Sequence, residues 1–156
     1  MTRAPIHAVF DCNVYLQAMI SPYGAAHQCW QRALAGEIRL YVTAYILDEV
    51  TGLAQHRKLF RLRQFTHERL DRFVHILTRT ASFVDSPPHL FTYPRDPKDS
   101  PYVDLAIFTG AFLVASNDKD LLDLMNDGDK AGVELRRQYP SFRVLTPAQL
   151  LVALDV

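Results

Sequence analysis

The chain has 156 residues, of which 49% are hydrophobic and 22% charged, and this composition is typical of one ordinary globular domain. It excludes disordered, collagen-like and low-complexity proteins. Cys12 and Cys29 cannot form a disulfide framework, and the apolar runs are shorter than the ~20 residues of a membrane helix. The first residues, MTRAPIHAVF, lack a signal-peptide pattern. We therefore expect a single cytoplasmic domain over residues 1–156, with no membrane contact.

The net charge is zero, with 17 basic and 17 acidic residues, but the two signs are separated along the chain. Residues 54–80 carry seven Lys or Arg and two acids, a local charge of +5. Residues 85–129 carry nine Asp and three basic residues, a local charge of −6. Such runs are usually solvated surface. They also fit an acidic site beside a basic surface that attracts polyanions, and composition does not choose between the two.

Short apolar runs alternate with segments of helical period. We expect strands at 6–11, 38–43, 82–85, 112–116 and 142–145. We expect helices up to residue 20, at 25–35, 45–55, one or two within 57–79, and at 101–111, 119–125 and from Pro147 onward. This alternation predicts an α/β fold with a mainly parallel sheet covered on both faces by helices.

Acidic residues follow two of the expected strands. Asp11 comes directly after the first strand, with Asn13 two residues later, and Asp118 follows the strand at 112–116. In doubly wound sheets, ligands bind beyond the carboxyl ends of the strands, where the strand order reverses. A single Asp at such a place is more often a helix cap than a catalyst. Two of them on different strands indicate a site.

Glu49 is a further candidate, carried by the expected helix 45–55. The apolar residues of this helix share one face, and the helical period directs Asp48 to water and Glu49 to the border of the buried face. A carboxylate at that border needs a cationic partner. A salt bridge to an arginine and a metal ion both meet this need.

The segment YPRDPKDSPYVDLAI offers three more acids, Asp96, Asp99 and Asp104. Pro101 suits the first turn of a helix, which puts Asp99 near the helix cap. Asp104 lies about 140° around the helix from Asp99, so the two are not expected to face one site. For each of the three, capping or a solvated loop is the simpler interpretation.

Carboxylates that converge without matching bases repel one another and raise each other's pKa. A hard divalent cation relieves this repulsion. Oxygen ligands favour Mg²⁺ or Mn²⁺, and the sequence has no cluster of Cys and His for zinc. Acidic clusters of this kind commonly serve the attack of water on phosphorus, which makes a phosphodiesterase site our physical interpretation.

The segments VFDCNVYLQAM, VTAYILDEV, RDPKDSPYVDLAIFTGAFLVASNDKDLL and VLTPAQLL, in this order, resemble the PIN-domain ribonucleases. The likeness covers nearly the whole chain and is greatest to the toxins of toxin–antitoxin systems, related to VapC-type toxins. It implies a three-layer α/β/α sandwich with a mainly parallel central sheet of four to five strands. It also implies a four-acid Mg²⁺ or Mn²⁺ site and cleavage of single-stranded RNA. The implied partners are RNA, a cognate antitoxin protein and a second copy of the chain in a homodimer.

The resemblance also assigns roles to single residues. The acids that it assigns to catalysis and metal binding are Asp11, Glu49, Asp99 and Asp118, with Asp96 and Asp104 as alternatives for the third position. The polar neighbours that would support these acids are Asn13, Ser116 and Asn117. None of the six histidines stands at a position that the family uses for catalysis.

The basic segment is a candidate RNA surface, because arginine binds phosphate through two hydrogen bonds. Arg57, Lys58 and Arg61 are the residues we assign to it. The alternative, about equally weighted, is that these side chains face solvent or pair with nearby acids.

Three other functions compete with the ribonuclease. A HAD-type phosphatase needs a second Asp where Asn13 stands, and a receiver domain has paired acids near its start and is shorter. A catalytically silent PIN-like scaffold that binds RNA or protein is the stronger rival. The presence of all four acids argues against such degeneration.

Overall fold

The sheet of this protein has five strands, all parallel, in a computed structural model that describes residues 3–156. The strands are β1 (Ile6–Phe10), β2 (Ile38–Val42), β3 (Ser82–Phe83), β4 (Leu113–Ala115) and β5 (Arg143–Leu145). Their order is β3-β2-β1-β4-β5. This arrangement confirms the expected three-layer α/β fold with a parallel sheet of four to five strands.

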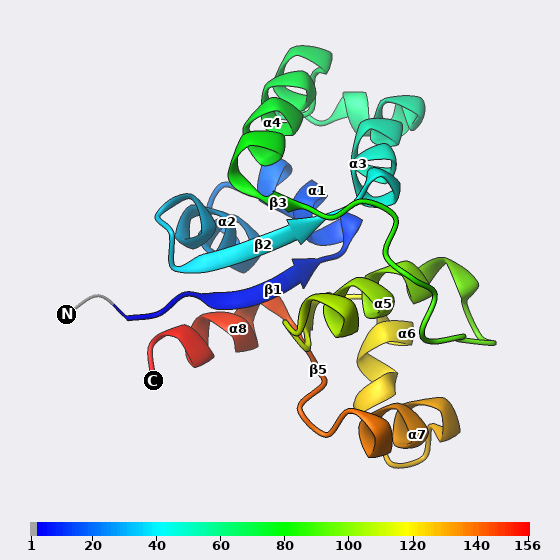
Figure 1. Cartoon of the computed structure of the whole chain (residues 1–156). Helices are drawn as coiled ribbons and strands as arrows, with labels where there is room; N and C mark the ends of the chain where they lie inside the picture. Colours follow the sequence, from blue (N-terminus) through cyan, green and yellow to red (C-terminus); the bar gives the residue numbers. More distant parts are fainter. Residues whose placement is uncertain (1–2) are drawn as a thin grey trace.

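Helices cover both faces of the sheet (Figure 1). They are α1 (Cys12–Ile20), α2 (Ala25–Leu34), α3 (Ala44–Thr51), α4 (His67–Thr80), α5 (Ser100–Thr109), α6 (Lys119–Leu122), α7 (Lys130–Gln138) and α8 (Pro147–Leu154). Helix α5 packs against β1, β2 and β4 on one face, whereas α1, α2 and α8 pack together on the other. Within residues 3–156, no helix is both long and apolar enough to cross a bilayer.

Four short 3-10 helices complete the chain: η1 (Gly52–Gln55), η2 (Arg57–Arg61), η3 (Pro97–Asp99) and η4 (Asp123–Met125). Two of them, η1 and η4, extend over parts of segments that the sequence predicts as single helices, and η2 lies in a segment predicted to hold one or two. The expected helix 45–55 is α3 followed by η1, the segment 57–79 holds η2 and most of α4, and the expected helix 119–125 is α6 followed by η4.

Helix α7 has no counterpart among the predicted elements, because its sequence KAGVELRRQ lacks a broad apolar stripe. Only Gly132 and Leu135 are buried in it. Gly132 is required by packing, since a Cβ there would lie 2.2 Å from the carbonyl oxygen of Leu124. Asp129 starts the helix by accepting a hydrogen bond from the Gly132 N–H at 2.9 Å.

Three strands run directly into helices at the same edge of the sheet. Asp11 caps α1 after β1, Thr43 caps α3 after β2, and Asp118 caps α6 after β4. Because β1 lies between β2 and β4, the chain connections diverge at this point of the sheet. Residues that follow these strands are therefore brought together where such folds bind ligands.

Candidate metal centre

A pocket of about 260 Å³ opens at this edge of the sheet, and we call it the acid pocket. The acids that line it are Asp11, Glu49, Asp96, Asp99 and Asp118. Four of them are the acids that the resemblance assigns to the site, and the fifth is one of its two alternatives. The structure thus brings together two carboxylates that follow strands β1 and β4, one carried by α3, and two from η3 and the residue before it.

Asp11 is 4% exposed, and two hydrogen bonds fix its carboxylate. Its Oδ1 accepts from the Val14 N–H at 3.0 Å, and its Oδ2 accepts from the hydroxyl of Ser116. The Ser116 oxygen in turn accepts from the Asp118 N–H at 2.8 Å. Burial outweighs these donors and raises the pKa of Asp11 to about 6. Ser116 therefore links the two acids that follow β1 and β4, consistent with the supporting role assigned to it.

Glu49 is half-buried on α3, whereas Asp48 is exposed, as the helical period predicts. The hydroxyl of Tyr102 donates a hydrogen bond to Oε1 of Glu49 and accepts one from the Cys12 N–H at 3.2 Å. Burial, more than this hydrogen bond, raises the pKa of Tyr102. The sequence analysis missed Tyr102. Its position three residues after Asp99 could have predicted this contact with the site, because residues three apart lie on the same side of a helix.

Asp99 is 7% exposed and lies at the junction of η3 and α5. Its Oδ2 is buried and has no hydrogen-bond partner among residues 3–156. Burial is the main cause that raises the pKa of Asp99 to about 7, followed by the charges of Asp118 and Asp96. A buried carboxylate oxygen without a partner carries a desolvation cost that a cation would offset. This oxygen is the feature that fits a bound metal ion.

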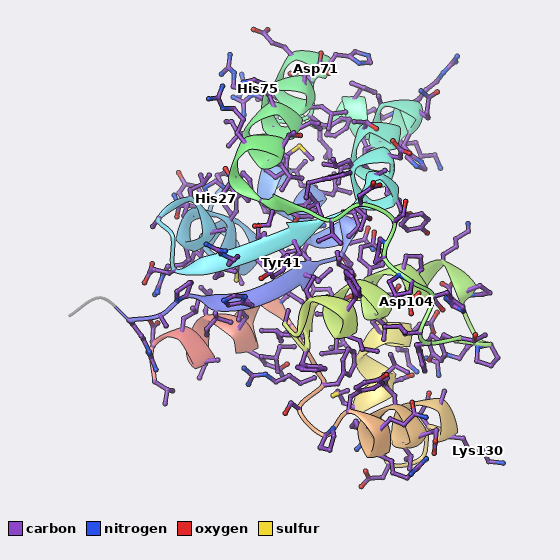
Figure 2. All side chains as sticks on the ribbon, in the orientation of Figure 1. His27, Tyr41, Asp71, His75, Asp104 and Lys130 are labelled. Carbon is purple, nitrogen blue, oxygen red and sulfur yellow. The ribbon has the colours of Figure 1, made fainter. Side chains whose placement is uncertain are left out.

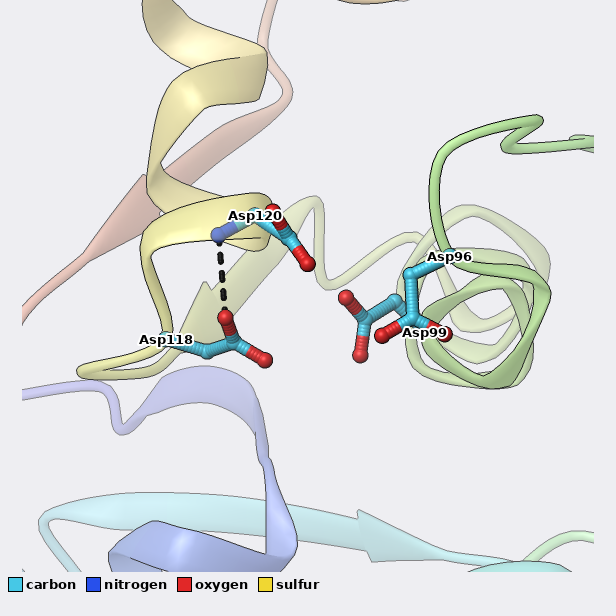
Figure 3. A group of neighbouring side chains, drawn as sticks. All are labelled: Asp96, Asp99, Asp118 and Asp120. Atoms are coloured by element: carbon cyan, nitrogen blue, oxygen red, sulfur yellow. Dashed lines mark hydrogen bonds between the residues drawn. The ribbon is translucent and has the colours of Figure 1, made fainter.

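Four aspartates, three of which line the acid pocket, form a compact group (Figure 3). Asp96, Asp99, Asp118 and Asp120 each offer one oxygen, and these oxygens lie within 4.8 Å of one another. Such an all-oxygen donor set suits Mg²⁺ or Mn²⁺. Asp120 was not among the residues predicted from the sequence, although it lies two residues after Asp118. In the structure the Asp120 N–H donates a hydrogen bond to Oδ1 of Asp118 at 2.9 Å.

Arg95 joins the two segments that carry this group. Its Nε lies 2.9 Å from Oδ1 of Asp120, and its Nη2 lies 2.7 Å from Oδ2 of Asp123. Its Nη1 lies 3.6 Å from Oδ2 of Asp129. The loop with Asp96 is therefore held against helix α6, which carries Asp120. From the sequence, Arg95 was counted only among the three basic residues of the acidic segment 85–129, and no role was predicted for it.

Asp104, which is labelled in Figure 2, is 5% exposed. It is not among the residues that line the acid pocket. Its Oδ1 accepts from the N–H groups of Leu90 and Phe91 at 2.9 and 2.7 Å, and its Oδ2 lies 2.8 Å from Nδ1 of His89. Both oxygens therefore hold the loop before α5 in place. The structure does not support Asp104 as a third metal ligand, consistent with its angular separation from Asp99, and leaves Asp99 and Asp96.

The two predicted asparagines lie at the surface beside the acid pocket. Asn13 is exposed and lines the acid pocket together with a second cavity, whereas Asn117 is exposed and lines only the second cavity. Neither makes a side-chain hydrogen bond to the acids in the part of the chain that the structure describes.

The basic residues assigned to RNA lie on η2, immediately after His56, which lines the acid pocket. Arg57, Lys58 and Arg61 are exposed. Across residues 3–156 none of these three forms an ion pair with a carboxylate, whereas Arg72 on α4 lies 3.7 Å from Glu68. These three are thus exposed cations that follow a pocket residue along the chain.

Comparison with known proteins adds a family and one distant relative. The sequence model of the PIN domain matches residues 7–120, which hold every acid of the pocket. The "Uncharacterized protein MJ1680" of Methanocaldococcus jannaschii is 27% identical over 129 residues, which cover 81% of this chain and 80% of that protein. No solved structure matches the chain significantly.

Proposed function

The chain belongs to the PIN-domain family, and on that premise we propose that it is a metal-dependent endoribonuclease that cleaves single-stranded RNA. The family is one of nucleases, and the five acids that line the acid pocket support this proposal. The observation that carries the proposal is the buried Oδ2 of Asp99, which has no hydrogen-bond partner among residues 3–156 and belongs to a residue of the converging aspartate group.

The residues we propose as ligands for Mg²⁺ or Mn²⁺ are Asp11, Glu49, Asp99 and Asp118, with Asp96 beside them. A bound divalent ion supplies charge neutralisation and activates water for attack at phosphorus. The protein's own contribution is to hold the carboxylates before the ion arrives. Ser116 orients Asp11, and Tyr102 orients Glu49. Partners of this kind fix the direction in which a ligand oxygen points.

Cys12 lies in the pocket but is unsuited to act as a nucleophile. Burial, followed by the charges of Glu49 and Asp11, raises the pKa of its thiol to about 12. The reactive thiolate is therefore scarce at neutral pH. This supports direct hydrolysis by water rather than a covalent intermediate on the protein.

We infer that RNA reaches the acid pocket along η2. An acidic pocket repels phosphates, so the substrate needs cations nearby. Arg57, Lys58 and Arg61 follow His56 at the pocket wall and have no acidic partner in the described chain.

The biological role we propose is that of the toxin in a toxin–antitoxin pair, with a cognate antitoxin protein and a homodimer as its assemblies. Expression of the wild-type chain alone should then arrest growth of a bacterial host. Expression of Asp11→Asn to the same level should not. Equal growth with both would contradict the toxin role and leave the nuclease to be judged by its own assay. A gene for a short DNA-binding protein directly upstream would support an antitoxin.

The nuclease itself is tested by incubating the purified chain with single-stranded RNA and with single-stranded DNA of the same sequence. We expect cleavage of RNA with Mg²⁺ or Mn²⁺, none with EDTA, and none by Asp11→Asn. Cleavage of both substrates would keep the nuclease and remove the RNA preference. RNA binding without cleavage under any divalent ion would favour the silent scaffold.

A further inference from the structure

A second cavity, of about 490 Å³, adjoins the acid pocket, and we call it the amide groove. Its polar side chains are Asn13 and Gln17 from α1, Ser21 after that helix, and Asn117 after β4. Asn13 also lines the acid pocket, so the two cavities are neighbours at this residue. The volume falls within the ~300–1,000 Å³ of typical small-ligand sites.

The chemistry of the amide groove differs from that of its neighbour. No Lys, Arg, Asp or Glu is among its lining residues, and three of its four polar side chains are amides. Each amide offers both a hydrogen-bond donor and an acceptor, as the edge of a nucleobase does. A phosphate would instead call for cations; Lys98 lines the acid pocket, and the cations of η2 follow His56, which lines it too.

The remaining wall of the groove is small and apolar. Ala25 at the start of α2 and Ala148 at the start of α8 leave room beside the amides. A flat ring can lie against such a surface while its edge meets the amides. The groove thus has the apolar wall and the few polar groups that small-molecule sites use for affinity and orientation.

We propose that the amide groove binds the base of one nucleotide adjoining the scissile phosphate of the RNA and thereby sets the sequence preference of cleavage. This inference rests on the proposed ribonuclease function. The phosphate lies in the acid pocket, the base on one side enters the groove past Asn13, and the strand on the other side follows η2. Unpaired bases are available for such contacts in single-stranded RNA.

The test measures RNA binding in the Asp11→Asn background, which prevents cleavage. The ligand is a short single-stranded RNA that the wild type cleaves at one mapped bond, together with a series in which each position in turn is abasic. The groove variants are Gln17→Ala/Asn117→Ala, which removes two amides, and Ala148→Phe, which fills the space. All three residues are exposed, so the fold is retained.

The matched controls lie on α2 and α8, two helices that contribute to the groove, at residues that do not line it. Gln28→Ala removes an exposed amide from α2, and Val152→Phe adds an aromatic ring to α8 at a residue that is 66% exposed. Neither residue lines the amide groove or the acid pocket.

We expect one abasic position beside the cleaved bond to weaken binding about tenfold, in line with the loss of a base contact. The groove variants should bind the intact RNA at that weakened level and no longer distinguish it from the abasic RNA. The controls should behave as the background protein does.

Full base dependence in the groove variants would overturn the inference and leave the ribonuclease intact. Uniform weakening of every RNA, abasic ones included, would also overturn it, because it would indicate a backbone contact. A change of oligomeric state with unchanged RNA binding would identify the groove as a protein contact and overturn it too. Absence of both cleavage and RNA binding in the wild type would remove the proposed function together with this inference.

Discussion

Nη2 of Arg95 lies 2.7 Å from Oδ1 of Asp120, and this ion pair joins the loop before α5 to helix α6. Both segments bring carboxylates to the same point, so their charges push them apart. A guanidinium between Asp120 and Asp123 offsets that repulsion. The pairing also raises the pKa of Arg95, through its hydrogen bonds to Asp123 and Asp120.

We therefore expect Arg95→Ala to weaken Mn²⁺ binding roughly 10–100-fold, as the loss of groups that orient metal ligands does elsewhere. Arg95→Lys should recover part of the affinity, since it restores one charge but not the two-sided contact. The matched control is Arg137→Ala, which breaks an exposed pair with Glu134. Calorimetric Mn²⁺ titration measures all three, and equal affinities for Arg95→Ala and Arg137→Ala would refute the positioning role.

Two buried aspartates of α5 and its junction should respond in opposite ways to the same substitution. Asp99→Asn removes a charge that has an unpartnered oxygen, so the metal-free protein should melt at a higher temperature at pH 8. Asp104→Asn should lower the melting temperature, because it replaces the charged acceptor of two backbone hydrogen bonds by a neutral amide and so weakens these bonds. Thermal melts in EDTA compare the two. A lower melting temperature for both would show that Asp99 is a structural residue.

The stability of the metal-free protein should increase as the pH is lowered from 8 toward 5. Asp11 and Asp99 have pKa values of about 6 and about 7 in the folded chain, raised mainly by burial, against an ordinary value of 3.8. In that window the folded state binds more protons than the unfolded state, so acid favours folding through these two groups. Urea unfolding in EDTA measures the trend.

Saturating Mn²⁺ should reverse this dependence, because the ligands must be deprotonated to bind the ion. Asp99→Asn serves as the control, since it should lose the part of the metal-free trend centred near pH 7. A free energy of unfolding that decreases from pH 8 to pH 6 in EDTA would contradict the claim that burial raises the pKa of Asp11 and Asp99.

The strand-end rule and the helical period selected three of the five acids that line the acid pocket. Asp11 and Asp118 follow strands that turn out to be neighbours, and Glu49 faces the pocket while Asp48 faces water, as the period of α3 predicts. The end of a strand and the period of a helix are properties of local structure, which local patterns report, whereas the pairing of β1 with β4 follows from the fold class.

Contacts between distant segments could not be obtained in this way. Tyr102 reaches Glu49 across 53 positions, and Arg95 reaches Asp120 across 25. Such pairings depend on how the loop before α5 folds over the sheet, which no periodicity encodes. Helix α7 was missed for a related reason, since it is held by the approach of Gly132 to Leu124 rather than by an apolar face.

The cations of η2 should contribute to RNA affinity through phosphates. In the Asp11→Asn background, Arg57→Glu/Arg61→Glu should weaken binding of all single-stranded RNAs alike. Each lost phosphate contact should reduce the slope of log affinity against log salt by roughly 0.7. The matched control is Arg72→Glu on α4, a residue that is paired with Glu68. An unchanged slope for the η2 variant would place the RNA path elsewhere.

The central claim, that the converging carboxylates form a divalent metal site, is tested most directly by Mn²⁺ titration of the metal-free protein and of three variants. We expect specific binding by the wild type, loss of it in Asp99→Asn, weakening in Glu49→Gln, and wild-type affinity in Asp48→Asn, whose side chain is exposed on the same helix. Wild-type affinity in Asp99→Asn, or no specific binding by the wild type itself, would contradict the account.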